Sequence, residues 1–416
     1  MNNTTGMPKI PKHAPMSQFN IADNCLQIGG QPLIDIARQL GSTPFYAYDR
    51  AVMRTQTDQL RDAQPAAVHL HYAMKANPMP EVVSYLAELA DGLDVASAGE
   101  LKVALEAGAA PINISFAGPG KSDADLQAAI DSGVIINMES NGEMLRIAAL
   151  AENKSVRPRV AIRVNPDFEL KSAGMKMGSG PKPFGVDAEC VPAMLKTLGR
   201  LPLEFMGFHI FSGSQNLQEQ AIIDAQAKTF ELAFRLAQFA PSPVRWLNIG
   251  GGLGIPYFPG DQRLNLAAIG KNLLPLVEVA RTRLPGAEIV MELGRYLSAE
   301  AGIYVCEVVD RKTSRGQVFL VTNGGLHHHL AASGNFGQVI RKNYPLCLGN
   351  RIAADEMELV NVVGPLCTPL DVLGNKVVLP RADPGDLIVV FQSGAYGFTA
   401  SPKDFLSHPH PTEILL

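Results

Sequence analysis

Short apolar runs alternate with amphipathic segments from about residue 67 to residue 293, and this alternation restricts the fold more than any other feature. The runs are typical of buried parallel strands, and the segments between them have apolar residues at helical spacing. Eight such units predict a closed (β/α)8 barrel; a doubly wound open sheet is the alternative, but it rarely needs eight units. The runs lie near 67–75, 93–97, 112–117, 134–138, 159–165, 204–212, 245–250 and 288–293.

The pattern changes after residue 298, which indicates a second domain. Several β-rich runs follow one another with Gly, Pro and Asn between them and no convincing helical pattern, so we predict a mostly antiparallel β domain. The expected organisation is a flexible N-terminal tail at 1–18, N-terminal strands that pack with the β domain at 19–48, the cofactor-binding barrel at 49–298 and the β domain at 299–416.

Composition gives no reason to expect nucleic acid or membrane as a partner. The net charge is -4 at pH 7 and the sequence pI is about 6.2, so a basic surface is not expected. No apolar run approaches the roughly 18 residues that span a bilayer. The five cysteines are odd in number and scattered, which favours a reducing compartment and predicts a cytoplasmic protein.

Lys75 is the residue on which the functional interpretation depends. It closes the first apolar run, where partial desolvation predicts a lowered pKa and a nucleophilic amine of the kind that forms a Schiff base. A strand-end lysine that reaches out to water is the alternative. Barrels carry their chemistry at the C-terminal ends of the strands, so other unusual residues at these ends favour the functional interpretation. These residues are Asp94, Arg163, His209, Phe211, Ser214, Gly250, Gly251, Gly252, Glu292, Gly294 and Arg295.

Three of these features together predict pyridoxal 5'-phosphate (PLP) as the cofactor. The backbone N–H groups of Gly250–Gly252 and the hydroxyl of Ser214 are suited to a phosphate. Glu292 can face a ring nitrogen and keep it protonated; a salt bridge with nearby Arg295 is its alternative role. A lysine imine, a phosphate cradle and a carboxylate at a pyridine nitrogen are the contacts that PLP requires.

The predicted β domain carries three further candidate features. Cys367 lies in a loop framed by Gly and Pro, which is a good place for an exposed acid, although a lone cysteine is more often a buried hydrophobe. Tyr396 follows a strand and can offer its hydroxyl to the phosphate. The run His327-His-His329 looks like a metal cluster, but adjacent histidines on a strand point to opposite faces and no spaced fourth ligand follows, so we predict no metal.

These motifs resemble those of the fold-type-III PLP decarboxylases, which include the diaminopimelate, ornithine and biosynthetic arginine decarboxylases. The resemblance runs from about residue 25 to Leu416 and implies an alanine-racemase-like barrel with a β domain, in a head-to-tail homodimer with shared active sites. The matching motifs are Tyr72-Ala-Met-Lys-Ala-Asn77, Asp94-Val-Ala-Ser-Ala-Gly-Glu100, Gly207-Phe-His-Ile-Phe-Ser-Gly-Ser-Gln215, Gly250-Gly-Gly252, Glu292-Leu-Gly-Arg295, Gly364-Pro-Leu-Cys367 and Gly394-Ala-Tyr396.

The resemblance implies a role for each principal residue. Lys75 carries the cofactor, Glu292 pairs with the pyridinium, and Cys367 of a second subunit donates a proton. Ser214, Gly252 and Tyr396 hold the phosphate. The cofactor site is also expected to include Asp94, Arg163, His209, Phe211, Gly250, Gly251, Gly294 and Arg295, and the substrate is expected to meet Arg295, Thr368, Asp371 and Tyr396.

Departures from the family pattern bear on the substrate. Phe211 stands where diaminopimelate decarboxylases have a ring-stacking histidine, and Thr368 stands where the family has a Glu or Asp that grips a distal amine. The segment 323–329 replaces an Asp-Ala-Gly-Met-Asn-Asp pattern, and the arginine expected after it is absent. A charged substrate end would lose its counter-charge at a cost of several kcal/mol.

Together with Lys176-Met-Gly178, His327-His-His-Leu330 and Asn343-Tyr-Pro345, these departures resemble a subgroup that includes decarboxylases of exosortase/exopolysaccharide loci and of carrier-protein-bound amino acids. The leading prediction is α-decarboxylation of a free amino acid or an aminoacyl carrier protein, with release of CO2 and an amine. The alternatives are the diaminopimelate decarboxylase of lysine biosynthesis, an amino-acid racemase of the same fold and a non-enzymatic cofactor carrier. The loop that carries Cys367 favours a decarboxylase over a racemase.

Overall fold

A closed barrel of parallel strands forms the larger part of this computed structural model, which describes residues 12–416 except 153, 155, 170–174, 177–179 and 355. Its strands are β5 (Val68–Ala73), β6 (Gly92–Val95), β7 (Ile114–Phe116), β8 (Ile135–Met138), β9 (Arg159–Asn165), β12 (Glu204–Ile210), β14 (Trp246–Gly251) and β15 (Glu288–Leu293). Hydrogen-bonded neighbours run from β9 through β12, β14, β15, β5, β6 and β7 to β8, and β8 pairs with β9 to close the ring. The predicted (β/α)8 barrel is confirmed.

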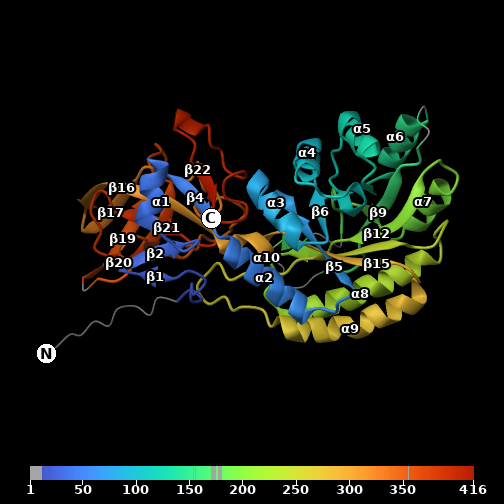
Figure 1. The fold of residues 1–416 in the computed structure, drawn as a ribbon, viewed down its shortest axis with the longest axis horizontal. Helices are drawn as coiled ribbons and strands as arrows, with labels where there is room; N and C mark the ends of the chain where they lie inside the picture. Colours follow the sequence, from blue (N-terminus) through green and yellow to red (C-terminus); the bar gives the residue numbers. More distant parts are fainter. Residues whose placement is uncertain (1–11, 153, 155, 170–174, 177–179, 355) are drawn as a thin grey trace.

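Helices on the outside of the barrel follow the strands (Figure 1). Their N-termini have side-chain caps where the sequence offers an Asp or Ser: Asp49 accepts from the N–H groups of Ala51 and Val52, and Ser122 forms a capping box with Asp125. The helices are α2 (Arg50–Ala63), α3 (Pro80–Leu89), α4 (Ala98–Glu106), α5 (Asp123–Ser132), α6 (Asn141–Ala151), α7 (Val191–Leu198), α8 (Glu219–Ala237), α9 (Leu266–Arg283) and α10 (Arg295–Ser298).

Apolar and polar residues occupy successive positions along the same strand faces. A small buried cluster, separate from the main core, consists of Ile135, Ala161, Met206, Trp246 and Val290. Side chains two residues apart on a strand share a face, so the apolar position on four of these strands is followed by a polar one nearer the C-terminal end. These polar residues are Asn137, Arg163, Asn248 and Glu292, all buried. The mouth of the barrel is therefore polar.

The second domain is a mostly antiparallel sheet, as predicted. It combines one strand that precedes the barrel in the sequence with strands that follow the barrel. Its strands are β16 (Gly302–Ser314), β17 (Gln317–Thr322), β18 (Leu346–Leu348), β19 (Met357–Val363), β20 (Val372–Pro380), β21 (Leu387–Val390), β4 (Phe45–Tyr48) and β22 (Thr412–Leu415). β4 lies antiparallel to β16 and parallel to β22. Figure 1 shows β4 and β22 together in this domain, to the left of the barrel.

A small N-terminal unit lies against the β domain. It comprises β1 (Ile21–Ala22), β2 (Cys25–Ile28), β3 (Gln31–Pro32) and α1 (Leu33–Leu40). The N–H of Leu26 donates to the carbonyl oxygen of Gly349 at 2.8 Å. Residues 1–11 of the expected tail, and Met177 and Gly178 of the Lys176 motif, lie outside the described residues. Among the helices that the structure describes, none is long and apolar enough to cross a membrane.

Candidate active site

Lys75 lies at the C-terminal mouth of the barrel, on a turn of 3₁₀ helix, η1 (Met74–Ala76), that follows β5. Its Nζ atom is 5.8 Å from the centroid of the Phe211 ring, just beyond β12. A cavity at this mouth brings together eight of the residues predicted from the sequence. Its lining consists of Ala73, Lys75, Phe211, Ser214, Gly252, Leu253, Glu292, Leu293, Gly294, Arg295, Tyr296 and Tyr396.

The Lys75 side chain is accessible from the cavity, but protein atoms surround it on its other sides. This partial exclusion of water lowers the pKa of Lys75, whereas Glu292 and then Tyr396 raise it, and the net result is a pKa above the usual lysine value. The expected lowered pKa of the free amine is therefore wrong. Desolvation acts as expected but is outweighed by a neighbouring carboxylate.

Three consecutive glycines at the end of β14 bring the backbone close to the cavity. Gly250 and Gly252 have φ angles of +69° and +87°, which favour glycine over other residues. A Cβ atom on Gly251 would lie 2.0 Å from the carbonyl oxygen of Glu292. The side chain of Asn248 accepts from the N–H of Gly250 at 2.7 Å. Only glycines fit this path, which leaves main-chain groups beside Ser214 for an anion.

Glu292, on β15, is a buried carboxylate with two neighbours on one oxygen. Asn248 Nδ2 donates to Glu292 Oε2 at 3.1 Å, and His209 Nε2 lies 3.2 Å from the same oxygen. The contact between His209 and Glu292 is a close approach of 3.2 Å, and neither ring nitrogen of His209 has another polar partner among the described residues. Burial raises the pKa of Glu292, but His209, followed by Lys75 and Arg163, outweighs it and holds that pKa well below the usual range.

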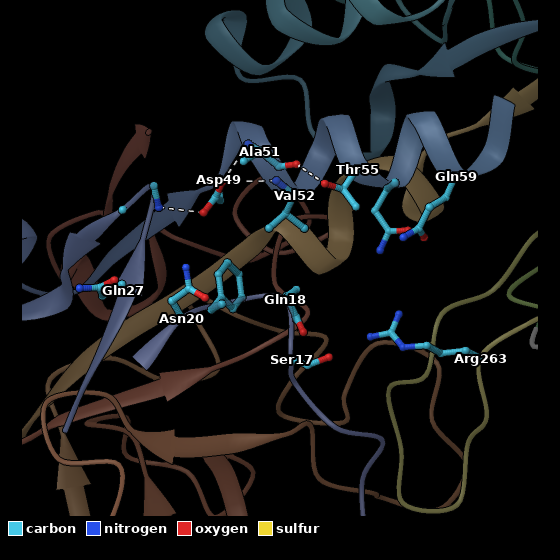
Figure 2. A pocket seen from close by; sticks show the side chains of 14 residues that line it. Ser17, Gln18, Asn20, Gln27, Asp49, Ala51, Val52, Thr55, Gln59 and Arg263 are labelled. Atoms are coloured by element: carbon cyan, nitrogen blue, oxygen red, sulfur yellow. Dashed lines mark hydrogen bonds between the residues drawn. The ribbon is translucent and has the colours of Figure 1, made fainter. Parts of the chain in front are cut away.

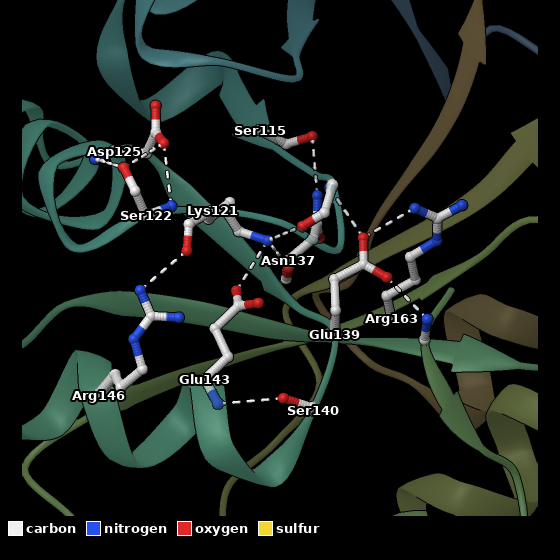
Figure 3. Close-up of polar contacts among 12 residues, drawn as sticks. Ser115, Lys121, Ser122, Asp125, Asn137, Glu139, Ser140, Glu143, Arg146 and Arg163 are labelled. Carbon is white, nitrogen blue, oxygen red and sulfur yellow. Dashed lines mark hydrogen bonds and ion pairs between the residues drawn. The ribbon is translucent and has the colours of Figure 1, made fainter. Parts of the chain in front are cut away.

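Arg163 is held by a carboxylate at the end of the next strand (Figure 3). Arg163 Nη1 donates to Glu139 Oε1 at 2.8 Å. The N–H groups of Gly118 and Gly185 donate to the same carboxyl group at 2.8 and 2.7 Å, respectively. Glu139 is thus fully engaged, so it fixes the guanidinium at the barrel mouth and neutralises its charge.

Asp94, at the end of β6, has one of its two carboxylate oxygens paired inside the barrel. His71 Nδ1 lies 3.4 Å from Asp94 Oδ1, and Ser115 donates a short hydrogen bond to the same oxygen. Asn137 Nδ2 donates to Ser115 Oγ at 3.2 Å. Asp94 and Arg163 are therefore buried around the cavity rather than part of its lining.

Arg295 and Tyr396 form the side of the cavity next to the β domain. Arg295 Nη1 donates to the Tyr257 hydroxyl at 2.8 Å, and its guanidinium carbon lies 4.5 Å from the centroid of the Tyr396 ring. Tyr396 has a φ angle of +54°, uncommon for a residue with a side chain. Its N–H donates to the carbonyl oxygen of Ala76 at 2.8 Å, which anchors it beside Lys75.

The other β-domain candidates lie in the loop between β19 and β20 and do not appear among the described residues that line the cavity of Lys75. Cys367 is exposed. Thr368 Oγ1 accepts from the N–H of Leu370 at 3.3 Å. Asp371, expected to meet the substrate, is 2% exposed, and its carboxylate accepts from the N–H groups of Leu326 and Leu366 at 2.6 and 2.9 Å. Its observed contacts secure the loop.

The three consecutive histidines lie in a turn after β17, so the expectation that they sit on a strand is wrong. All three are buried, and the ring centroids of His327 and His328 are 3.7 Å apart. His329 Nε2 lies 2.9 Å from Ser393 Oγ. Within the described ranges, no group of three or more His, Cys, Asp or Glu side chains is arranged to hold a metal ion.

A separate cavity lies between α2 and the segment 17–20 and contains none of the predicted site residues (Figure 2). Polar side chains surround it, with Arg263 opposite Gln59. The Arg263 guanidinium is already paired with buried Glu300 at 2.6 Å. Among the described residues that line this cavity, none is a lysine and the Asp49 carboxylate is used to cap α2, so the mouth of the barrel is the candidate active site.

Several residues of the site were not predicted. They share one property: each is a polar residue that lies inside or directly after an apolar strand, on the strand face that leads to the candidate site. They are His71, Ser115, Asn137, Glu139 and Asn248. The period of two along each strand was the signal that could have identified them.

Comparisons with known proteins agree with this geometry. Residues 50–299 match the family described as "Pyridoxal-dependent decarboxylase, pyridoxal binding domain". The L-glutamyl-[BtrI acyl-carrier protein] decarboxylase of Niallia circulans is 40% identical over 90% of this chain and 88% of its own length. The diaminopimelate decarboxylase of Aquifex aeolicus is 32% identical over 99% of this chain and 94% of its own. The crystal structure of Helicobacter pylori diaminopimelate decarboxylase complexed with L-lysine has a TM-score of 0.82 at 27% identity and covers 92% of this chain and 94% of that one.

The residues of the site fit the cofactor that this family binds. The glycine cradle offers backbone groups to a phosphate, the amine of Lys75 lines the cavity, and a buried, ionised carboxylate stands at Glu292. The sequence, the fold and this site agree with the comparisons, and the chain belongs to the pyridoxal-dependent decarboxylases as a PLP-dependent carboxy-lyase that acts on an amino acid.

Proposed function

We propose that the substrate is an amino acid whose far end is uncharged because it is joined to a carrier protein. The supporting observation is Thr368, which offers a neutral hydroxyl next to Cys367 where the diamine decarboxylases have a carboxylate. A hydroxyl does not compensate an ammonium that has been removed from water. The 40% identical relative is named for a glutamyl group on an acyl-carrier protein, which agrees with a substrate of this class.

The chemistry of α-decarboxylation determines where the carrier is attached. The α-amine must be free to reach the cofactor, and the α-carboxylate must be free to leave as CO2. A glutamyl substrate can therefore be linked only through its side-chain carboxyl group. A thioester or amide at that position also removes the negative charge at the far end of the substrate.

Near the Cys367 loop, one carboxylate is already paired and three histidines are neutral, while the Arg341 guanidinium donates to the carbonyl oxygen of Val372 at 2.6 Å. The carboxylate of Asp371 is occupied by two backbone N–H groups. Burial, together with neighbouring histidines, lowers the pKa of His327 to about 4 and that of His328 to about 3, and burial lowers the pKa of His329 to about 3. All three are therefore neutral at pH 7.

In the proposed site, Lys75 would provide the amine that attaches the cofactor, and Glu292 would face the ring nitrogen. Gly250–Gly252, Ser214 and Tyr396 would hold the phosphate, and Arg295, which donates to the Tyr257 hydroxyl, lines the same cavity. Bound PLP supplies an acceptor for the electron pair left at Cα when CO2 departs. Cys367 then delivers a proton to Cα.

Cys367 would reach this site from a second copy of the chain. Within one chain it is exposed and absent from the described lining of the Lys75 cavity. Exposed apolar side chains lie close to this loop, at Phe336, Val339, Ile340 and Leu370. The segment 335–340 contacts the Cys367 loop, because Asn335 Nδ2 donates to Leu370 O at 3.3 Å. Such a patch is typical of a protein interface. A head-to-tail homodimer would cover it and complete both active sites.

We also propose that the protein works in the cytoplasm. The cysteines are free, and two of them are exposed to solvent, which suits a reducing environment. The five are Cys25, Cys190, Cys306, Cys347 and Cys367.

The test of the substrate class is CO2 release by the PLP-loaded enzyme. The panel comprises glutamyl carrier protein linked through the side chain, the same group on pantetheine alone, free L-glutamate, meso-diaminopimelate, ornithine and arginine. The free diamino acids should be roughly 10²-fold or more below the linked substrate in kcat/KM. A kcat/KM for free diaminopimelate of about 10⁴ M⁻¹s⁻¹ or more would contradict the proposal, because that is an ordinary value for a natural substrate.

A further inference from the structure

We propose that His209 is a positioning residue for Glu292: it keeps this carboxylate ionised, so that the proton between Glu292 and the cofactor's ring nitrogen stays on the nitrogen. The inference rests on the assignment of Glu292 to the ring nitrogen proposed above. It assigns different roles to the two groups: Glu292 faces the cofactor, and His209 favours the ionised form of Glu292.

The geometry places His209 behind Glu292. His209 on β12 and Asn248 on β14 are partners in the parallel register, and Glu292 lies on the next strand, β15. His209 and Glu292 are only 1% and 6% exposed. Both neighbours contact Glu292 Oε2, at 3.2 Å from His209 and 3.1 Å from Asn248. Glu292 Oε1 is therefore the oxygen left for the ring nitrogen.

The imidazole of His209 has no other polar contact that would explain its position. Neither of its ring nitrogens has a hydrogen-bond partner among the described residues, although both are buried. Its ring lies 6.4 Å from that of Phe211, at an interplanar angle of 60°. A buried polar group without a partner requires an explanation, and the short approach to Glu292 provides one.

The other charged groups around Glu292 cannot replace His209. Lys75 also lowers the pKa of Glu292, but its amine would be taken up by attachment of the cofactor. Arg163 is committed to Glu139 at 2.8 Å. The imidazole of His71 pairs with Asp94 at 3.4 Å. His209 and Asn248 are thus the two groups in direct contact with Glu292 Oε2 that the cofactor does not take up.

The expected effect follows from the relative proton affinities of the carboxylate and the ring nitrogen. A buried carboxylate without compensation has a raised pKa and tends to take up a proton. A cation or an N–H dipole at Oε2 acts more strongly on the nearby carboxylate than on the more distant nitrogen. It therefore shifts the shared proton toward the nitrogen and keeps the ring an efficient electron acceptor.

The test is NMR of the ring nitrogen in isotope-labelled PLP bound to the whole protein, which reports the protonation state without turnover. His209→Asn should lower the ratio of protonated to unprotonated ring nitrogen by about tenfold, the equivalent of one pKa unit. The matched control is His69→Asn, which removes an exposed imidazole that pairs with Glu288 at 3.0 Å and should leave the ring-nitrogen signal unchanged. His209→Leu replaces His209→Asn if the asparagine variant does not fold, because leucine brings no N–H group to Glu292.

Glu292→Gln separates the inference from the proposed function. An unchanged ring-nitrogen signal in Glu292→Gln would contradict the assignment of Glu292 itself. A shifted signal in Glu292→Gln with a native signal in folded, PLP-loaded His209→Asn would overturn the role of His209 alone. The double variant should show the signal of Glu292→Gln, because His209 acts only through the carboxylate.

Discussion

The backbone N–H of Tyr396 donates to the carbonyl oxygen of Ala76 at 2.8 Å, and this bond joins the β domain to the turn that carries Lys75. Asn77 Nδ2 reinforces the junction by donating to the carbonyl oxygen of Gly394 at 3.1 Å. The turn that carries Lys75 and the backbone of Tyr396 are therefore joined directly even though they belong to different domains. Several expectations about catalysis depend on this junction.

Lys75→Ala should abolish covalent attachment of the cofactor, because no other lysine lines the cavity among the described residues. Borohydride reduction of the PLP-loaded protein, followed by peptide mapping, should place the label on Lys75. Lys102→Ala is the control, since Lys102 is exposed on α4 and pairs with Glu106. Full activity and a reducible imine in Lys75→Ala would refute the assignment.

Cys367→Ala should slow turnover by roughly 10²–10⁴-fold, the usual contribution of a positioned acid. The absorbance of the bound cofactor should stay the same, because Cys367 does not line the cavity in the described part of one chain. Cys190→Ala, which removes an exposed thiol at the start of α7, serves as the control. An unimpaired Cys367→Ala enzyme would mean that another group delivers the proton.

Mixtures of Lys75→Ala and Cys367→Ala protein should regain activity that neither variant has alone. A hybrid dimer with shared sites contains one site with both native residues. Activity should be measured after subunit exchange, with exchange followed separately by differently labelled subunits. If the subunits exchange and activity does not return, each site is contained within one chain.

His329→Gln should make the protein less sensitive to acid. Burial lowers the pKa of His329 to about 3, and its Nδ1 accepts from the N–H of Ala332 at 3.2 Å. The unfolded chain protonates His329 near pH 6.5, whereas the folded chain does so only near pH 3. The contribution of neutral His329 to the free energy of unfolding is therefore complete above pH 6.5 and falls by about 1.4 kcal/mol per pH unit between pH 6.5 and pH 3. Urea unfolding should be measured between pH 7 and pH 4. The slope of the free energy of unfolding against pH should correspond to about one proton fewer in the variant than in the native protein.

His13→Gln is the comparison for that experiment, because His13 is only partly buried and makes one side-chain contact, with the carbonyl oxygen of Asn343 at 2.9 Å. Its slope should equal that of the native protein. An equal slope for His329→Gln and the native protein would mean that His329 is protonated in the folded state at these pH values.

The barrel and much of its polar mouth could be predicted because both depend on local periodicity. Strand ends such as Asp94, Arg163 and Glu292 are visible in sequence as polar residues that close apolar runs. The pKa shift of Lys75 could not be predicted in the same way, since the direction of the shift depends on how close Glu292 lies in space. Sequence shows that both residues are present, but the balance between desolvation and charge requires distances.

The β domain was harder to predict in detail because its contacts join distant segments. The turn at His327–His329 has no local signal, and its buried position depends on Ser393 and Pro409, which come much later in the chain. Asp371 was expected to face a substrate, but its carboxylate is used to hold Leu326 and Leu366. In both cases the residue type suggested a chemical role, but tertiary packing determines which groups the side chains contact.

The pairing of β4 with β16 and β22 has a consequence for the order of folding. β4 precedes the barrel in sequence, and both of its partner strands follow the barrel. On the ribosome, β4 therefore stays unpaired while the whole barrel is synthesised, and domains generally fold as units during synthesis. The bond between Tyr396 and Ala76 also has to wait for the last part of the chain. The nascent protein thus builds its barrel before it can fix the turn that carries Lys75.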